Sequence, residues 1–302
     1  MATGQNRAMS APWLMVGASF LFAVMGVCVK LAAATYTTGE IVFYRSAFGA
    51  IFIAALARNR GIRLRTGMPG AHLWRTIYGV TSLALMFYSM QYLPLGTAMT
   101  LNNTSSVWIG LILASSALLT GSSRIDWRLL AAVLLGFVGV ALVLRPTMDR
   151  NQLWYGLAGL LAGVLAATAY LQVIALGRRG EPDTRIVFYF SLGGAVAGAV
   201  MTSWTGWKLP TGGGATLLLA VGLFATVGQL LMTRAFSTGN TLVNASLQYL
   251  VIVFSFAYGI LLFDEPLVGT ALLGALLIIG AGVTASLFSN RPAVAPGSPA
   301  RR

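Results

Sequence analysis

A ten-residue segment of this chain occurs twice. Ile41–Ala50 reads IVFYRSAFGA and Ile186–Ala195 reads IVFYFSLGGA, so seven of the ten positions are identical. Chance alone would match roughly one position in ten in so apolar a composition. The match continues at a shift of 143 residues, where for example Gly79 aligns with Gly222. The chain is therefore an internal duplication, and its two halves are expected to share one fold.

The amino-acid composition indicates whether this duplicated fold is surrounded by water or by lipid. Hydrophobic residues make up 57% of the chain and charged residues 9%, and the mean hydropathy is +0.79, whereas soluble domains carry about 25% charged residues. Apolar runs of about 20 residues, the length a helix needs to cross the hydrocarbon layer, recur throughout. The chain is predicted to be an all-α membrane protein embedded in a lipid bilayer. The net charge of +13 does not indicate nucleic-acid binding, because the basic residues form short clusters between apolar runs.

Glycine, proline and charged residues divide the chain into ten expected transmembrane helices. Their approximate ranges are 13–34, 39–57, 71–92, 95–119, 127–145, 153–176, 184–204, 213–235, 241–262 and 266–288. Five helices per repeat is an odd number, so the second repeat must cross the membrane in the opposite direction. We therefore expect residues 1–146 to form one five-helix repeat and 147–290 its inverted copy, the construction of many secondary transporters. The Pro-rich tail 291–302 is expected to be disordered.

The distribution of basic residues predicts the orientation. With the N-terminus inside, three basic residues fall on the outer side and fifteen on the cytoplasmic side. The outer residues are Arg145, Arg150 and Lys208; the cytoplasmic group is Arg7, Arg58, Arg60, Arg63, Arg65, Arg75, Arg124, Arg128, Arg178, Arg179, Arg185, Arg234, Arg291, Arg301 and Arg302. This positive-inside bias predicts a multi-pass protein of the bacterial inner membrane with both termini in the cytoplasm.

Two stretches carry a resemblance to a known family. YLPLGTAMTLNNTSSVWIGLILASSALL precedes the fifth expected helix, and LLFDEP precedes the Gly-rich GALLIIGAGV of the tenth. They resemble the drug/metabolite transporter superfamily, and within it the EamA-type amino-acid and metabolite exporters, including the aromatic amino-acid exporter branch. The resemblance covers about Trp13 to Phe288 and implies ten helices in two inverted repeats. One departure is that Asp264 and Glu265 of the second half match Gly121 and Ser122 in the first.

The sequence contains no pattern of residues typical of a catalytic or metal-binding site. The single histidine, His72, stands at the start of the third expected helix, and the single cysteine, Cys28, lies inside the first. All seven acidic residues fall in loops or at helix ends, and no phosphate-binding glycine loop is present. We therefore predict a protein that is not an enzyme and needs no cofactor or metal. Proton-coupled transporters usually carry a titratable group at mid-depth, so facilitated export and proton antiport are both retained as mechanisms.

Three charged residues are candidates for a substrate-carboxylate or gating role. Lys30 lies about one turn from the outer end of its helix, where the alternative is a side chain that extends to the interface. Arg45 lies about two turns into the second helix, where snorkelling and binding of a substrate carboxylate are equally favoured. Glu40 is the helix-end acid that would serve if protons were coupled.

Polar and aromatic side chains recur at helical spacing in expected helices 3, 4, 8 and 9. Such faces must point away from lipid, and they either join packed helices or line a shared cavity. Because these four helices are equivalent pairs in the repeat, we predict a central cavity in which aromatic rings suit apolar or aromatic amino acids. The candidate substrate-binding residues are Tyr78, Ser82, Tyr88, Asn102, Asn103, Trp108, Tyr170, Gln229, Asn244, Gln248 and Tyr249.

The sequence thus predicts an exporter of amino acids and related small metabolites that works by alternating access. Its expected partners are a small-molecule substrate and the lipid bilayer, and either a monomer or a homodimer is compatible. A drug or nucleotide-sugar carrier is the alternative within transport, and a membrane pore or lipid-modifying enzyme is the alternative outside it.

Overall fold

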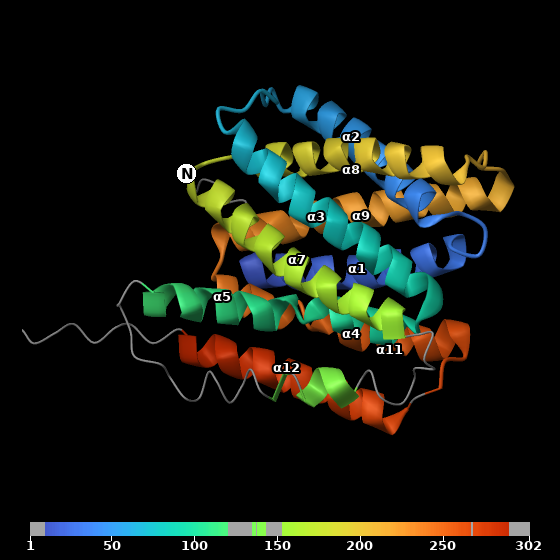
Figure 1. Ribbon diagram of the computed structural model, residues 1–302. Helices are drawn as coiled ribbons and strands as arrows, with labels where there is room; N and C mark the ends of the chain where they lie inside the picture. The colour runs from blue at the N-terminus through green and yellow to red at the C-terminus, as the bar shows by residue number, and fades with distance from the viewer. Residues whose placement is uncertain (1–9, 120–134, 137, 143–152, 267, 290–302) are drawn as a thin grey trace, which may run out of the picture.

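The computed structural model describes residues 10–119, 135–136, 138–142, 153–266 and 268–289, and over these ranges it is helical without strands. The principal helices form one bundle (Figure 1). They are α1 (Ala11–Ala32), α2 (Thr38–Asn59), α3 (Pro69–Tyr92), α4 (Leu95–Asn103), α5 (Ser105–Leu119), α7 (Leu153–Arg178), α8 (Asp183–Thr205), α9 (Gly212–Thr238), α10 (Thr241–Leu247), α11 (Leu250–Phe263) and α12 (Gly269–Ser289).

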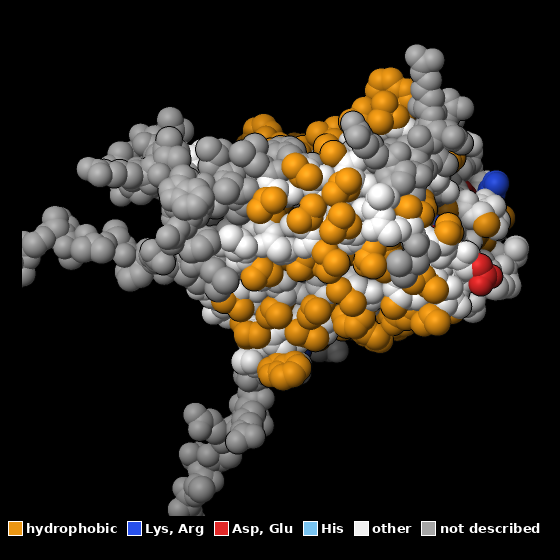
Figure 2. All heavy atoms as spheres, turned by 90° about the horizontal axis from the view of Figure 1, so that it is seen from below, with side chains coloured by type: hydrophobic (Ala, Val, Ile, Leu, Met, Phe, Trp, Pro, Cys, Tyr) orange, Lys and Arg blue, Asp and Glu red, His pale blue; other side chains and the backbone are white. Residues whose placement is uncertain are grey.

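The outer surface and helix lengths fit a bilayer. Within the described residues, six helical segments are long and apolar enough to cross a membrane, and Gly269–Ala281 is a shorter apolar one. The prediction of an all-helical membrane protein is confirmed, whereas the count of ten helices stays a prediction. Most of the expected helix 127–145 and the tail 291–302 lie outside the described residues. Figure 2 shows hydrophobic side chains spread over the middle of one face, with the visible charged side chains at one end.

The helices pair as two inverted halves would. The most extensive contacts join α2 with α8, α1 with α9, and α3 with α7. In the repeat, α1 corresponds to α7 and α3 to α9, so the second and third of these pairs are equivalent to each other. The first pair joins the two copies of the repeated decapeptide, and it forms one edge of the bundle opposite α12 (Figure 1).

Glycines allow α2 and α8 to pack antiparallel and close together. A Cβ at Gly49 would lie 2.8 Å from Ser191 Oγ, and a Cβ at Gly194 would lie 2.5 Å from Ser46 Oγ. The contact is reciprocal, because each repeat places its glycine against the serine of the other. Small residues of this kind let helix backbones approach within a membrane, where no hydrophobic effect drives helices together. The repeated decapeptide is therefore the seam between the two halves.

Two expected helices are broken, and at nearly equivalent places. The continuous helices expected over 95–119 and 241–262 are interrupted at Thr104, between α4 and α5, and at Gln248–Tyr249, between α10 and α11. Hydrogen bonds of the i→i+3 type replace the α-helical ones there, from Thr104 N to the Leu101 carbonyl (3.2 Å) and from Tyr249 N to the Ser246 carbonyl (3.2 Å). At the first break, the Thr104 hydroxyl also donates to that Leu101 carbonyl (2.6 Å), and such side-chain competition weakens a helix.

Residues 135–136 and 138–142, the described part of the expected helix 127–145, pack against α12 at the edge opposite α2 and α8 (Figure 1). A Cβ at Gly139 would lie 2.7 Å from the Gly274 carbonyl oxygen, which requires glycine at this crossing. Gly136 faces Val107 and Ala281. Gly280, in the Gly-rich stretch of α12, has open space beside it. Close helix packing therefore requires a glycine at position 139, whereas position 280 leaves room for a side chain.

Candidate functional site

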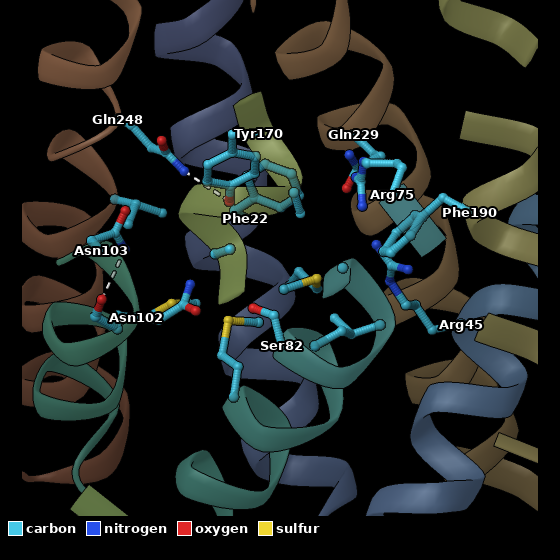
Figure 3. A pocket seen from close by; sticks show the side chains of 18 residues that line it. Phe22, Arg45, Arg75, Ser82, Asn102, Asn103, Tyr170, Phe190, Gln229 and Gln248 are labelled. Atoms are coloured by element: carbon cyan, nitrogen blue, oxygen red, sulfur yellow. Dashed lines mark hydrogen bonds between the residues drawn. The ribbon is translucent and has the colours of Figure 1, made fainter. Parts of the chain in front are cut away.

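A cavity lies at the centre of the bundle, between the two halves. It contains about 650 Å³ of space not occupied by protein atoms, part of which is open to solvent. Its lining comes from α1, α2, α3, α4, α7, α8, α9 and α11, with Gln248 at the break before α11 (Figure 3). Both helix breaks therefore lie beside it. Interrupted helices at mid-depth are tolerated where they are buried in protein or line a cavity, since the freed backbone groups need partners that lipid cannot supply.

One side of the cavity carries two buried cations. Arg45 of α2 and Arg75 of α3 are 4% and 2% exposed, and their guanidinium carbons lie 5.0 and 4.3 Å from the ring centroid of Phe190. Phe190 is the repeat equivalent of Arg45, so equivalent positions of the two halves meet here. Arg45 Nε and Arg75 Nε and Nη1 have no hydrogen-bond partner, and no carboxylate in the described ranges forms an ion pair with either residue.

The glycine one turn after Arg75 makes room for its side chain. A Cβ at Gly79 would lie 1.9 Å from Arg75 Nη1 and 3.0 Å from Phe190 Cε2. The guanidinium therefore lies along α3, against the glycine, and points toward Phe190 and the cavity. This arrangement keeps a long cationic side chain inside the bundle rather than letting it extend toward the helix end.

The other side of the cavity presents amide groups. Figure 3 shows Gln248, Asn102 and Asn103 on one side and Arg45 and Arg75 on the other. Gln248 Nε2 donates to the Tyr170 hydroxyl (3.0 Å) and Asn103 Nδ2 donates to the Met99 carbonyl (2.8 Å). These bonds leave the side-chain oxygens of Gln248 and Asn103, and also that of Asn102, buried without a partner. Three hydrogen-bond acceptors therefore border the cavity.

Between these two sides the lining is largely apolar. Met25, Met86 and Met99 contribute flexible thioethers, and Phe22 contributes a ring. Methionine adapts its shape to different ligands. Ser82 also lines the cavity, but its hydroxyl donates to the Ala162 carbonyl (2.8 Å). Among the described lining residues there is no aspartate, glutamate or histidine.

The structure brings seven of the predicted site residues to this cavity. They are Arg45, Ser82, Asn102, Asn103, Tyr170, Gln229 and Gln248. Gln229 stands on the same side as the arginines (Figure 3), and its Nε2 has no partner. The polar pattern of helices 3, 4, 8 and 9 thus predicted most of the polar lining.

The structure places the other five predicted binding residues elsewhere. Tyr78 stacks on the exposed Trp74, and Tyr88 packs against Tyr92 and Tyr155, so both belong to outward faces of the bundle. Trp108 borders a smaller separate pocket with Thr104 and Val107. Helical spacing alone did not show which side of each ring-bearing helix faces inward.

Asn244 and Tyr249 lie outside the cavity lining. The Asn244 amide donates to the Ala235 carbonyl near the end of α9, which links α10 to the preceding helix. Tyr249 is 2% exposed and belongs to the apolar core beside the helix break. A polar face on a helix can thus serve two purposes along its length, with Gln248 toward the cavity and Asn244 toward a neighbouring backbone.

Lys30 and Glu40 are also absent from the cavity lining. Lys30 forms an ion pair with Glu265 and donates to the Leu93 carbonyl (3.2 Å), and Glu265 in turn accepts from Leu95 N (3.0 Å). Lys30 is therefore paired with an acid and does not line the cavity. Glu40 forms a capping box with Thr37 at the start of α2 and accepts from the Lys208 backbone amide. These contacts hold the Glu40 carboxylate at the start of that helix.

Sequence reasoning missed Arg75 and Phe190. Arg75 was grouped with the cytoplasmic basic residues, but it is buried inside α3, six residues after its first residue, Pro69. The signal was present, since Arg75 lies within the expected helix 71–92 and four residues before a glycine. Phe190 gave no polar signal, and only its alignment with Arg45 marks it. Without Arg75, the cytoplasmic excess is still fourteen against three, and the orientation stays a prediction.

Comparisons with known proteins agree with this arrangement. The model of the EamA-like transporter family matches twice, over residues 9–145 and 153–287. The pseudopaline exporter CntI of Pseudomonas aeruginosa (strain UCBPP-PA14) is 35% identical over 282 residues, covering 90% of this chain and 94% of the relative. An S-adenosylmethionine uptake transporter of Rickettsia felis (strain ATCC VR-1525 / URRWXCal2) is 27% identical over 250 residues, covering 80% of each chain.

A solved crystal structure shares the fold. It has a TM-score of 0.68 and 19% sequence identity, and the match covers 94% of this chain and 100% of the other. The curated relatives are named as transporters, which confirms the expectation that the protein is not an enzyme. The double family match, the arrangement of equivalent helix pairs and the central cavity lead to the same conclusion: this chain belongs to the EamA-like transporter family and is a multi-pass membrane transporter.

Proposed function

We propose that the protein exports amino acids and related small metabolites across the bacterial inner membrane by alternating access. The observation that carries the proposal is the central cavity between the two halves, bordered by both helix breaks. In inverted-repeat transporters, substrate sites lie near the midplane, where interrupted helices of the two repeats meet. The outward direction rests on the relative that is named an exporter.

The cavity supports an amino-acid-like substrate through its opposing polar sides. Guanidinium groups pair with carboxylates, often through two parallel hydrogen bonds, and the amide oxygens of Gln248 and Asn103 can accept from an amino group. Apolar substrate parts would contact the methionines and Phe22. Of the five predicted aromatic contacts only Tyr170 lines the cavity, so the preference for aromatic side chains rests on Tyr170, Phe22 and Phe190.

Counterflow in proteoliposomes tests this function. Vesicles loaded with one unlabelled amino acid or dipeptide at a time should accumulate its labelled form, and the rate should saturate. Ala166 is 4% exposed and lines the cavity, so Ala166→Leu should reduce the rate. Val200→Leu, at a position 47% exposed on the surface of α8, is the matched control and should transport normally. Flux that does not saturate would indicate a pore instead.

A further inference from the structure

We infer that the substrate is an organic anion with more acidic groups than amino groups: its carboxylates bind Arg45 and Arg75, and its amine faces Gln248 and Asn103. This inference rests on the proposed transport function and assigns the chemical class of the cargo. It is carried by the two buried guanidinium groups and by the unpartnered amide oxygens across the cavity.

The first argument is the charge balance of the cavity. A buried cation is costly unless an anion and hydrogen bonds compensate for it, and inside a membrane such residues usually mark a substrate or ion path. Among the described residues, Arg45 and Arg75 share the ring of Phe190, and an aromatic ring attracts a cation without supplying a counter-charge. A single carboxylate would leave one of the two guanidinium groups without a counter-charge. Two acidic groups on the cargo would neutralise both.

The second argument is the choice of arginine and its placement. A guanidinium presents five donors in a fixed planar arrangement that matches a carboxylate. Arg45 and Arg75 come from different helices but the same repeat, and their equivalents in the other repeat are Phe190 and Leu218. The positive charge therefore lies on one side of a cavity that is otherwise built from both halves. An asymmetric cargo with its acidic groups at one end fits this asymmetry.

The third argument comes from the side opposite the arginines. The Asn103 amide orientation is fixed by its donation to the Met99 carbonyl, so its free oxygen is an acceptor. The Gln248 oxygen and the Asn102 oxygen are also buried without partners. A protonated amine has three donors and no acceptor, which suits these three oxygens. The methionines between the two sides accept the apolar part that joins amine and acids.

A matched pair of dipeptides provides the test. Glutamyl-leucine and glutaminyl-leucine have nearly the same shape, but only the first carries the extra carboxylate. In counterflow by the wild-type protein, labelled glutamyl-leucine should show an apparent affinity at least tenfold higher than that of labelled glutaminyl-leucine. Arg45→Met and Arg75→Met should each weaken the apparent affinity for glutamyl-leucine roughly 10- to 100-fold, because each removes a charge-assisted contact. Each should also reduce the difference in affinity between glutamyl-leucine and glutaminyl-leucine. Arg58→Met, at the exposed end of α2, is the control and should behave as wild type.

Thermal unfolding in detergent separates binding from a structural role. Without ligand, Arg45→Met and Arg75→Met should unfold at the same temperature as wild type or higher, since an unpaired buried charge is replaced by an apolar side chain. Glutamyl-leucine should raise the unfolding temperature of the wild type and not that of the double variant. A drop in stability without ligand for both variants would make the arginines structural and overturn the inference.

Two further outcomes distinguish the inference from the proposed function. Equal saturable transport of both dipeptides, unchanged by the arginine variants, would overturn the anionic cargo while transport itself stands. No saturable flux of any amino acid or dipeptide would overturn both. Guanidinium groups also pair with phosphate. Counterflow of O-phosphoserine is therefore measured as well, with serine as its unphosphorylated control. A preference for O-phosphoserine over glutamyl-leucine would overturn the carboxylate assignment.

Discussion

At the scale of single residues, Gly79 governs where the charge of Arg75 lies. A Cβ at Gly79 would overlap the far end of the Arg75 side chain rather than backbone, so Gly79→Ala should displace the guanidinium from Phe190 without unfolding the helix. We expect substrate affinity to fall several-fold while the unfolding temperature stays near that of wild type. Gly280→Ala, where nothing lies within contact distance, is the control. Unchanged affinity in Gly79→Ala would show that this position of Arg75 is not needed.

Gln248 and Asn244 should respond differently to truncation, although one helical pattern marked both. Gln248 faces the cavity and bonds only to Tyr170, so Gln248→Ala should weaken substrate binding by roughly tenfold and change stability little. Asn244 donates to the backbone of α9, so Asn244→Ala should lower the stability by about 1–3 kcal/mol and leave affinity unchanged in the folded fraction. Measuring both properties for both variants checks this, and parallel losses in the two would contradict it.

What the sequence could predict at this scale depended on polarity. Asn102, Asn103, Gln229 and Gln248 were predicted because a polar side chain in an apolar helix must face inward. Tyr78 and Tyr88 lie away from the cavity, and an aromatic ring is stable at the lipid surface as well as inside. An aromatic residue therefore does not indicate which face of its helix points into the bundle until the helix packing is known. Arg75 gives two opposite signals, because it lies near a helix end and also within the apolar stretch of α3.

At the scale of helices, the crossing of α2 and α8 depends on glycine. A Cβ at Gly198 would lie 2.5 Å from the backbone nitrogen of Phe43, and backbone cannot move aside as a side-chain end can. Gly198→Ala should therefore separate the two helices and destabilise the protein by about 1–3 kcal/mol, seen as a lower unfolding temperature. Gly213→Ala, at a glycine with open space, is the control. Wild-type stability in Gly198→Ala would contradict the close crossing.

Helix positions were predictable, but helix breaks were not. The expected ranges 95–119 and 241–262 coincide with the outer limits of α4–α5 and α10–α11 to within a residue. No proline or glycine stands at either break, and these are the usual sequence signs of an interrupted helix. The interruption instead involves i→i+3 hydrogen bonds and polar side chains around Thr104 and Gln248. These depend on packing between the halves, which hydropathy does not encode.

At the scale of the whole molecule, two groups of charged side chains stand apart in the described residues: those paired with an opposite charge lie outside the cavity, and the two arginines without an acidic partner line it. Contacts between acidic and basic side chains in the described residues lie away from the cavity. Lys30 pairs with Glu265 beside the α3–α4 turn, and Glu181, which lies between α7 and α8, contacts Arg185 of α8 and His72 of α3. Burial alone would raise the pKa of Glu181, but hydrogen bonds from Thr66 and Arg185 outweigh it and hold that pKa below its usual range. The described lining of the cavity contains Arg45 and Arg75 but no aspartate or glutamate. Its described lining therefore offers no group that would carry a proton across during transport.

This division predicts transport that responds to voltage rather than to a pH gradient. A substrate with one net negative charge gains about 2.3 kcal/mol from each 100 mV of potential when it leaves a negative interior, and the described cavity lining has no carboxylate or histidine to bind and release a proton. In proteoliposomes, efflux of labelled glutamyl-leucine should persist when the pH gradient is abolished. It should accelerate when a potassium gradient with valinomycin makes the lumen negative, whereas the neutral glutaminyl-leucine should show no such acceleration. Strict dependence on a pH gradient at constant potential would contradict this prediction, and a titratable group outside the described lining would then have to carry the proton.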